Sequence, residues 1–441
     1  MSKYSLSALV AAGLLAGGMS VSSASAADLG GNCCADLEER IAELEATTAR
    51  KGNRKVSLTV SGWVGQQVTW WDDGGESNVY VNDLGTTLAS HVMFTGQAQI
   101  MPGWSAGYVL HLEAVGSDSL TMNQNTPDGP SVLTGTANGV GVLQSFWFIK
   151  SDQLGKVSVG KQSQASDNTA ILVDGSGSLV PANWVSFDYN GFFLRNSATG
   201  NLSNLNWGGA GGGVWGDDNG LPTNSVRYDS PTFGGFSVSA SWGESDFWDI
   251  AGRYAGEWHN FKVSLAAAYS QTSADLVQGV NTVNMVQPAG TGYFQFGGYV
   301  EHVPTGLFAY GAYGHLDYFD TNNALVLRPH GLDSNDTYYH KGGIRQRWNP
   351  LGHTVLYGEY MRAENHDSFA TDNGTGVGFG SATDPGVSMA NLWGVGVVQE
   401  IDAAAMSLWV KYRNIDASTF GDGAFPVDQM HQVSVGGLIN F

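Results

Sequence analysis

Charged residues are scarce in this chain. Lys, Arg, Asp and Glu together make up 14% of its 441 residues, whereas ordinary soluble domains carry about 25%. Between Val56 and Ile149 there is no Lys or Arg at all. The 40 acids outnumber the 20 bases, and the formal net charge is -20. Such an acidic chain is not suited to bind nucleic acid, because the phosphate backbone is itself negatively charged.

Cysteine and long apolar runs are also nearly missing. The only cysteines, Cys33 and Cys34, are adjacent. In an oxidising compartment they can form disulfides between chains, whereas a metal site needs further ligands, and none stand nearby. No run beyond the N-terminal segment reaches the roughly 18 apolar residues of a transmembrane helix. If the chain crosses a membrane, it must do so as a closed β-barrel, because lipid cannot satisfy the open edges of a sheet.

Glycine and aromatic residues are abundant instead. Gly accounts for 61 residues, and aromatic residues for 11% of the chain, including 14 Trp. The usual share of Gly is about 7%. Low charge combined with many Gly and aromatic residues is unusual for a soluble protein and typical of a barrel whose outer surface faces lipid.

The first 27 residues have the pattern of a signal peptide. Lys3 supplies a positive start, residues 6–18 an apolar stretch, and Ser25-Ala26-Ala27 a small-residue cleavage site. The alternative is a short buried helix, which would need a place to dock. Cleavage would remove Lys3 and no acid, so the exported chain would be one unit more negative.

Residues 28–49 have the spacing of a short coiled coil. Its apolar seam is formed by Cys34, Leu37, Ile41 and Leu44, at intervals of three and four residues. Two heptads are too short to be stable alone. We therefore expect a periplasmic self-association helix attached to something already oligomeric, and the alternative is a solvated amphipathic linker. A basic linker follows at 50–55.

From Val56 onward the apolar residues alternate with polar ones. This period of two predicts strands with one apolar and one polar face, and the first strand is too long for a sandwich. Seven short turns alternate with eight mostly longer loops, which is the layout of an outer-membrane barrel. The predicted fold is all-β, a 16-stranded antiparallel transmembrane β-barrel over 56–441 with both ends on the short-turn side. The predicted strands are 56–70, 92–100, 108–112, 141–150, 156–162, 225–230, 236–242, 250–258, 261–269, 294–302, 308–319, 338–348, 354–362, 388–400, 406–413 and 430–441.

One connection, 165–222, is far longer than compact domains usually allow. It separates either two domains or an upward from a downward strand of one barrel. The strand count favours the second interpretation, in which the loop folds inward and narrows the lumen. Its Gly-rich part at 208–220 is expected to reach the mouth or a neighbouring subunit.

The chain resembles the general porins of Gram-negative outer membranes, specifically those of alphaproteobacteria. The likeness covers essentially the mature chain and is carried by four features: 154–162, ending in Gly-Lys-Gln; Arg227-Tyr-Asp-Ser-Pro231 followed by 233–240; the terminal strand ending in Phe441; and the Cys-Cys leader before Val56. The resemblance implies a trimeric, water-filled channel narrowed by its third loop. It also implies that Phe441 is the assembly signal read by the barrel-assembly machinery.

In that family, acids on the third loop face a cluster of bases across the lumen. Lys161 matches a basic position of the family motif, with Lys in place of Arg. The base-free stretch from Val56 to Ile149 departs from the enteric pattern, so we expect the bases on later strands instead. The alternation predicts that these side chains face the lumen: Arg227, Arg253, Lys341, Arg345, Arg347, Lys411 and Arg413. About half of them are expected to anchor strand ends in the interfacial zone.

Asp174 and Asp188, in the middle of the long loop, are the predicted acids of the constriction. Together with Lys161, Arg227, Arg345 and Arg347 they form the predicted constriction set. His111, Glu113, His315 and Asp317 are expected to face the lumen as well. Asp217 and Asp218 are either solvated acids or weak calcium ligands, and no other metal site is predicted. The acid excess predicts a preference for cations.

These patterns predict an outer-membrane porin that lets ions and small hydrophilic solutes diffuse passively, without a cofactor. Its expected partners are outer-membrane lipid, further copies in a homotrimer, the barrel-assembly machinery and, through the coiled coil, the cell wall. No nucleophile-elbow motif or metal-spaced pair of His is present, so we expect no enzyme.

Three alternatives stay open. The first is a substrate-selective channel, for instance for sugars, with Trp63 and Trp409 in its lumen. The second is a structural envelope tether that acts through the coiled-coil leader. The third is a soluble all-β lectin or adhesin.

Overall fold

The computed structural model describes residues 55–136, 138–185, 187–210, 220–244, 246–272, 290–319, 332, 334–366, 385–421 and 423–441. The predicted signal peptide, coiled-coil segment and most of the basic linker lie outside these residues. So do the seam residues Cys34, Leu37, Ile41 and Leu44 and the weak calcium candidates Asp217 and Asp218.

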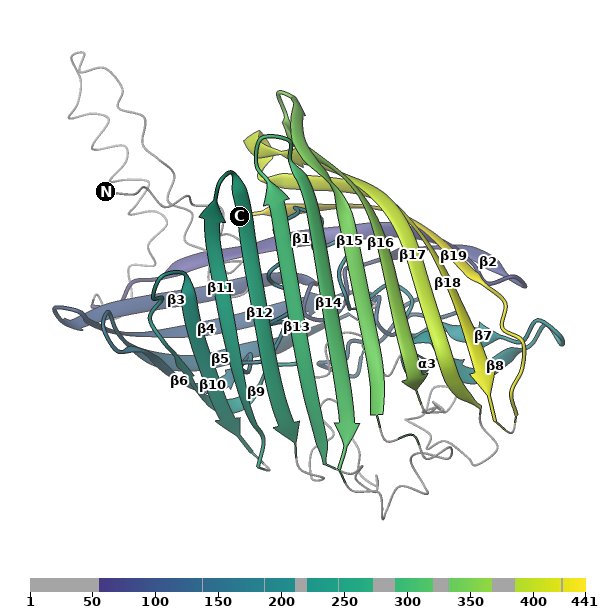
Figure 1. Ribbon diagram of the computed structural model, residues 1–441, viewed down its shortest axis with the longest axis horizontal. Helices are drawn as coiled ribbons and strands as arrows, with labels where there is room; N and C mark the ends of the chain where they lie inside the picture. The colour runs from purple at the N-terminus through teal and green to yellow at the C-terminus, as the bar shows by residue number, and fades with distance from the viewer. Residues whose placement is uncertain are drawn as a thin grey trace.

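Sixteen long antiparallel strands form one closed barrel (Figure 1). The predicted strands all correspond to observed ones, so the predicted fold class is confirmed. The barrel strands are β1 (Thr59–Asp72), β3 (Ser90–Met101), β4 (Trp104–Val115), β5 (Gly139–Ser151), β6 (Gly155–Gln162), β9 (Thr223–Asp229), β10 (Phe236–Gly243), β11 (Trp248–Trp258), β12 (Phe261–Thr272), β13 (Thr291–His302), β14 (Leu307–Tyr318), β15 (Ser334–Asn349), β16 (Gly352–His366), β17 (Gly386–Ile401), β18 (Met406–Phe420) and β19 (Met430–Asn440).

The barrel closes where its first and last strands pair. Strands β1 and β19 are in register from Trp63 opposite Asn440 to Asp72 opposite His431. The terminal Phe441 continues this pairing by exchanging backbone hydrogen bonds with Gly62. A short extra strand, β2 (Ser77–Asn82), folds back onto the upper half of β1. This pairing of the first barrel strand with the last makes the ring of strands continuous, as a membrane barrel requires.

The strands alternate between an outer apolar face and an inner face. On β1 the side chains of Val60, Val64 and Val68 are exposed on the outside, whereas Gln67 and Thr69 are buried inside. This is the period-two pattern that the sequence shows, and it gives the barrel an apolar belt for lipid contact. In the part of the chain that the structure describes, no helix is both long and apolar enough to span a membrane.

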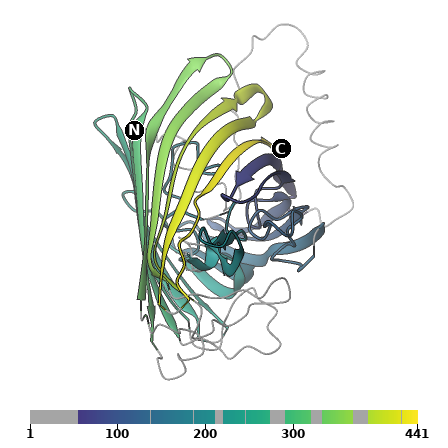
Figure 2. The same ribbon diagram turned by 90° about the vertical axis from the view of Figure 1, so that its right-hand side faces the viewer.

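Short turns gather at one end of the barrel and longer loops at the other (Figures 1 and 2). The C-terminus lies at the end with the short turns. The predicted alternation of turns and loops is therefore confirmed, and it places the constriction between an upward and a downward strand of a single barrel.

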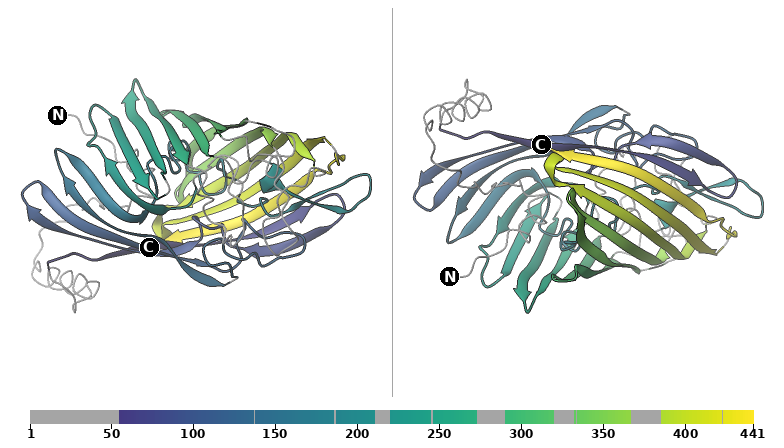
Figure 3. Two further views of the ribbon diagram at one scale, coloured as in Figure 1. Left: turned by 90° about the horizontal axis from the view of Figure 1, so that it is seen from below. Right: turned by 90° about the horizontal axis from the view of Figure 1, so that it is seen from above.

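The constriction loop comprises residues 163–222 between β6 and β9, and its described parts, 163–185, 187–210 and 220–222, run inside the ring of strands (Figure 3). It carries a two-stranded ribbon, β7 (Phe193–Arg195) with β8 (Leu202–Asn206), and a single helical turn, α3 (Trp207–Ala210). Its side chains Trp184, Tyr189 and Phe192 belong to one hydrophobic core with inward residues of the barrel wall. The loop is therefore packed against the wall and not a free strand of chain in the lumen.

Contact between the loop and the wall is so close that β13 needs a glycine. A Cβ atom on Gly297 would lie 2.2 Å from the carbonyl oxygen of Ala170 in the loop. Around this point, Gln295 accepts a hydrogen bond from the Ala170 amide at 2.8 Å and donates one to the Ser166 carbonyl at 3.0 Å. The hydroxyl of Tyr310 donates to the Ala170 carbonyl at 2.8 Å.

Replacing Gly297 by Ala tests this contact. We expect Gly297→Ala to push the loop from the wall, to destabilise the barrel by about 1–3 kcal/mol through overpacking and to raise current noise in single channels. The matched control is Gly298→Ala, because that Cβ would point outward and meet the flexible end of Leu265 at 3.2 Å and the ring of Phe296 at an ordinary contact distance of 3.8 Å. Thermal unfolding and single-channel recording measure both effects, and equal behaviour of the two variants would contradict the prediction.

Candidate channel constriction

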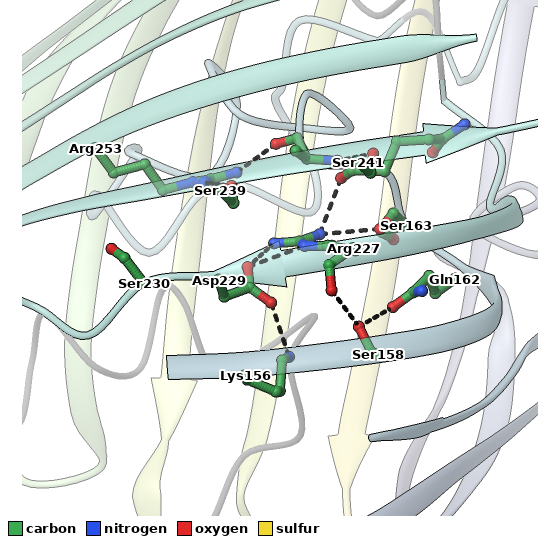
Figure 4. Close-up of polar contacts among 12 residues, drawn as sticks. Lys156, Ser158, Gln162, Ser163, Arg227, Asp229, Ser230, Ser239, Ser241 and Arg253 are labelled. Carbon is green, nitrogen blue, oxygen red and sulfur yellow. Dashed lines mark hydrogen bonds and ion pairs between the residues drawn. The ribbon is translucent and has the colours of Figure 1, made fainter. Parts of the chain in front are cut away.

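The root of the constriction loop is held by two arginines of the barrel wall (Figure 4). Arg227 on β9 donates to the carbonyls of Ser163 and Gln164, both at 2.9 Å, and to the carboxylate of Asp229 at 2.7 and 2.9 Å. Lys156 on β6 forms a second ion pair with Asp229 at 3.1 Å. Arg227 faces the lumen as predicted, but its guanidinium binds loop backbone instead of standing free in the channel.

Arg253 on β11 continues this grip on the loop. It donates to the Ala165 carbonyl at 2.7 Å, to the Thr169 hydroxyl at 2.8 Å and to the Ser239 hydroxyl at 2.6 Å. Asp249 on the same strand accepts from both the amide and the hydroxyl of Ser166, each at 2.6 Å. Donors and acceptors of the wall therefore satisfy the polar backbone that a loop brings into the lumen.

Asp167 is buried within this root cluster. Burial raises the pKa of its carboxyl to about 6, although Ser163 and the nearby Arg227 and Arg253 act in the opposite direction. Asp249 lies close enough to add to the increase. Asp167 thus titrates between mildly acidic and neutral pH, where ordinary Asp side chains are fully ionised.

The first predicted acid of the constriction, Asp174, lies directly against a base of the wall. Its carboxylate forms an ion pair with Lys341 on β15, and neither side chain is exposed to solvent. Lys341 also donates to the loop carbonyl of Ala182 at 2.6 Å. Asp174 and Lys341 are therefore in direct contact, whereas the sequence predicts that they face each other across the lumen.

Asp188 forms the second ionic contact of the loop. It pairs with Lys411 and, at 3.1 Å, with Arg413, both on β18. Arg413 in turn pairs with Glu359 on β16 at 2.8 Å. Gln67 of β1 donates to Asp188 at 2.8 Å. Burial alone would raise the pKa of Asp188, but the two bases more than offset this and hold its pKa below the ordinary range.

Arg345 and Arg347 lie farther along β15. Arg345 pairs with Glu400 at 2.9 Å, and Gly177 of the loop rests against this pair. Arg347 pairs with Asp402 near the short turns, and both side chains are about half exposed. Arg345 therefore touches the loop, whereas Arg347 belongs to the strand end, as was expected of part of the basic set.

His111 and Glu113 face inward as predicted but are covered. The carboxylate of Glu113 is fully buried and accepts hydrogen bonds from the amides of Thr87 and Ala89, each at 3.0 Å. The ring of His111 packs beside that of His91, with 4.3 Å between centroids. Glu113 supports the first loop (residues 73–89, between β1 and β3), His111 packs against β3, and neither side chain is exposed to solutes.

The prediction that Lys161 lines the constriction is wrong. On β6 the buried Ser158 and Gln162 point inward, so Lys161 shares the outer face with Val157. Its ammonium donates to the carbonyl of Val142 at 2.8 Å. The match to a family motif identifies a basic position on this strand, but it does not show whether the side chain faces the lumen or the lipid.

The prediction that His315 and Asp317 face the lumen is also wrong. On β14 the inward residues are Tyr310 and Leu316, which are buried, so the odd-numbered residues point outward. The ring of His315 bonds to Asp317 at 3.1 Å and to Asp336 at 2.8 Å. These side chains lie at the loop end of the strand, where the outer face passes beyond the apolar belt and polar residues are tolerated.

Trp63 and Trp409 face inward but offer no surface for sugars. Trp63 is 5% exposed, and its indole donates to the Leu88 carbonyl at 3.0 Å. Trp409 is 2% exposed and lies over Gly436. These two residues were the sequence evidence for a sugar-selective channel, and their burial removes that evidence.

Several residues of the site were not singled out in the sequence. Glu359 and Asp249 both lie at inward positions of their strands, so strand alternation could have identified them. Arg195 of the constriction loop and Asp73 of the first loop form a buried pair at 2.8 Å. No local pattern signals this pair, because 122 residues separate its members.

The lumen is divided into a covered and an exposed wall. Most inward residues of β13 to β18 away from the short turns are buried, with exposed fractions of 5% or less for Tyr299, Phe308, Tyr310, Tyr339 and Leu392. The inward residues in the turn-side half of β3 to β6 are partly or fully exposed; they include Gln97, Val109, Phe146, Phe148 and Lys150. The remaining passage therefore runs along β3 to β6. Within the described residues, no cluster of three or more His, Cys, Asp or Glu could hold a metal ion.

A family model described as Gram-negative porin matches residues 7–435. The chain belongs to the Gram-negative porin family. Porins are passive channels of the outer membrane, and the closed barrel with a loop packed inside it agrees with that function and location. The soluble lectin or adhesin is thereby excluded.

Solved structures show the same fold at low sequence identity. The anion-selective porin from Comamonas acidovorans matches with a TM-score of 0.54 and 16% identity, over 88% of this chain and 100% of that one. The outer membrane channel DcaP of Acinetobacter baumannii has a TM-score of 0.50 at 10% identity, over 89% and 99%. The trimer form of OmpT from Vibrio cholerae has a TM-score of 0.50 at 14% identity, over 88% and 99%. No curated protein matches the chain.

Removing one member of the pair between Asp174 and Lys341 should free the loop. We expect Asp174→Asn to cost about 3–5 kcal/mol, because it leaves Lys341 buried without an acid, and to increase conductance fluctuations. The double variant Asp174→Leu with Lys341→Met should recover most of the stability. Thermal unfolding and single-channel recording measure this. Lys161→Met is the control for charge, and a single variant as stable as this control would refute the prediction.

The root of the loop should become more stable at mildly acidic pH. The pKa of Asp167 is higher in the folded loop than in an opened one, so the folded form binds the proton more tightly, and stability falls as pH rises through about 6. Between pH 7 and pH 5 we expect about a tenfold decrease in the opening equilibrium. Hydrogen–deuterium exchange of residues 163–172, corrected for intrinsic rates, measures it.

Asp167→Asn should abolish this pH dependence, whereas Asp152→Asn in a short turn should keep it. A pH dependence that survives in Asp167→Asn would show that another group is responsible.

Proposed function

We propose that this porin is a non-enzymatic diffusion channel in which the constriction loop limits the size of ions and small hydrophilic solutes. The observation that carries the proposal is the attachment of Asp174 and Asp188 to Lys341, Lys411 and Arg413 of the wall. These contacts hold the loop against the lumen side of β15 and β18. A permanently attached loop restricts passage by size without any moving part.

We propose a homotrimer as the assembled form. The support is the family membership together with the trimer form of the Vibrio cholerae protein OmpT, which shares the fold. Assembly through the terminal Phe441 is part of the same proposal, and the exposed aromatic ring of this residue, 60% accessible, supports it. The Cys-Cys leader supports an alphaproteobacterial type of porin and a tether to the cell wall as a second role.

Ion preference is proposed to be weakly cationic. The acid excess of the whole chain favours cations. Asp174 and Asp188 add little to it, because each is neutralised by a base in direct contact. The preference should therefore be smaller than the net charge suggests.

Planar-bilayer recording of the purified protein tests these proposals together. We expect stable openings that close in three equal steps, and a reversal potential in a KCl gradient that corresponds to a modest preference for K⁺. Liposome swelling should slow steadily as neutral solutes grow larger, at equal rates for sugars of equal size.

Each outcome separates one element of the proposal. A single closing step would contradict the trimer, and a clear preference for Cl⁻ would contradict cation selectivity. Unequal rates for isomeric sugars would favour a substrate-selective channel. A matched control is Lys161→Gln, whose change in charge lies on the outer face and should leave all three readings unchanged.

A further inference from the structure

Two aromatic side chains stand where a water-filled channel is normally polar. Phe146 and Phe148 alternate on β5 with Trp147 and Ile149, which are exposed on the lipid side. The strand register places Phe146 beside Val109 and Phe148 beside Gly107, both on the inner face of β4. Lumen positions of such barrels are ordinarily polar. A partly exposed apolar patch is therefore unusual in the lumen, and exposed apolar patches typically mark binding sites.

The ring of Phe148 packs against β4. A Cβ atom on Gly107 would lie 2.3 Å from this ring, so the missing side chain of Gly107 makes room for it. Phe148 nevertheless remains partly exposed. This wall is the one that the constriction loop leaves uncovered.

Bases surround this aromatic surface. Lys150 follows Phe148 by two residues on the same face, and it stands directly opposite Lys156. Ser158 stands between Phe148 and Arg227 in the cross-strand register. Like charges in opposite positions destabilise a sheet. Among the described residues, Asp229 pairs with both Lys156 and Arg227, whereas Lys150 forms no ion pair. Lys150 therefore leaves an unbalanced positive charge beside the ring.

We infer that the inner face of β5 and β6 is a weak binding surface for small solutes that carry both an aromatic ring and a carboxylate. The ring of the solute would stack on Phe148, and its carboxylate would bind Lys150 or Lys156. A ring with a positive group is repelled by the bases, and an aliphatic carboxylate lacks the stacking contact. The inference rests on the proposed function, since it supposes that solutes pass along this wall.

Block of the KCl current by three probes of simple structure tests the inference. Phenylacetate, acetate and phenethylammonium are added to single channels in a planar bilayer, and the half-blocking concentration is measured for each. We expect phenylacetate to act at about one fifth of the concentration of the other two, which corresponds to about 1 kcal/mol. Equal concentrations for all three probes in the unaltered protein would overturn the inference without any variant.

Three variants assign the effect to this surface. Phe148→Leu keeps an apolar side chain but removes the ring, and should raise the half-blocking concentration of phenylacetate about threefold to fivefold. The double variant Lys150→Gln with Lys156→Gln should do the same through loss of charge. The control Lys161→Gln removes one positive charge from the outer face of β6 and should have no effect.

The outcomes distinguish this inference from the proposed function. Normal KCl conductance with unselective block, or selective block that survives Phe148→Leu, would overturn the inference alone. Absence of KCl conductance in the unaltered protein would overturn the diffusion channel itself.

Discussion

A charge buried inside the barrel must be paired, and this requirement holds the constriction loop in place. Lys341, Lys411 and Arg413 point from the wall into space that the loop fills, and water is excluded from all three. If the loop moved away from the wall, the ion pairs of these bases with Asp174 and Asp188 would break, and the two acids would also be left without their partners. Breaking one side of such a pair typically costs several kcal/mol. The loop and the wall therefore stabilise each other's charges.

The hydrophobic core of the molecule follows from this pairing. Once the loop lies on β13 to β19, its large side chains can bury themselves against inward aromatic residues of the wall, such as Tyr310 and Tyr339. In most soluble barrels the core fills the interior, and in a wide channel it is absent. Here the core fills one side only. The lumen is thus asymmetric, with an apolar, sealed side and an open passage beside β3 to β6.

The sequence was sufficient for the barrel but only in part for the constriction. Strand number, closure and the inward position of Lys341, Lys411 and Arg413 all follow from period-two alternation, because one side of each strand must face lipid. Beyond the apolar belt, the alternation of apolar and polar residues no longer shows which side chains face the lumen. His315 and Asp317 are polar, yet they face outward because the loop end of β14 passes beyond the apolar belt. The motif predicts that Lys161 faces the lumen. Because the buried Ser158 and Gln162 point inward on the same strand, Lys161 faces outward.

The contacts of the inward-facing bases were also not predicted correctly, and the reason is geometric. A sequence shows how many acids and bases face inward, but not whether they meet or stand apart across water. That depends on the path of a loop whose length permits both. Arg227 and Arg253 illustrate the limit further, since much of their hydrogen bonding is to the backbone carbonyls of Ser163, Gln164 and Ala165. Every residue has a carbonyl, so no composition or spacing could have indicated these partners. Bases that hold a loop in this way cannot also supply a free field across the channel. The field felt by a passing ion must therefore come from the exposed wall and the mouth, not from the loop.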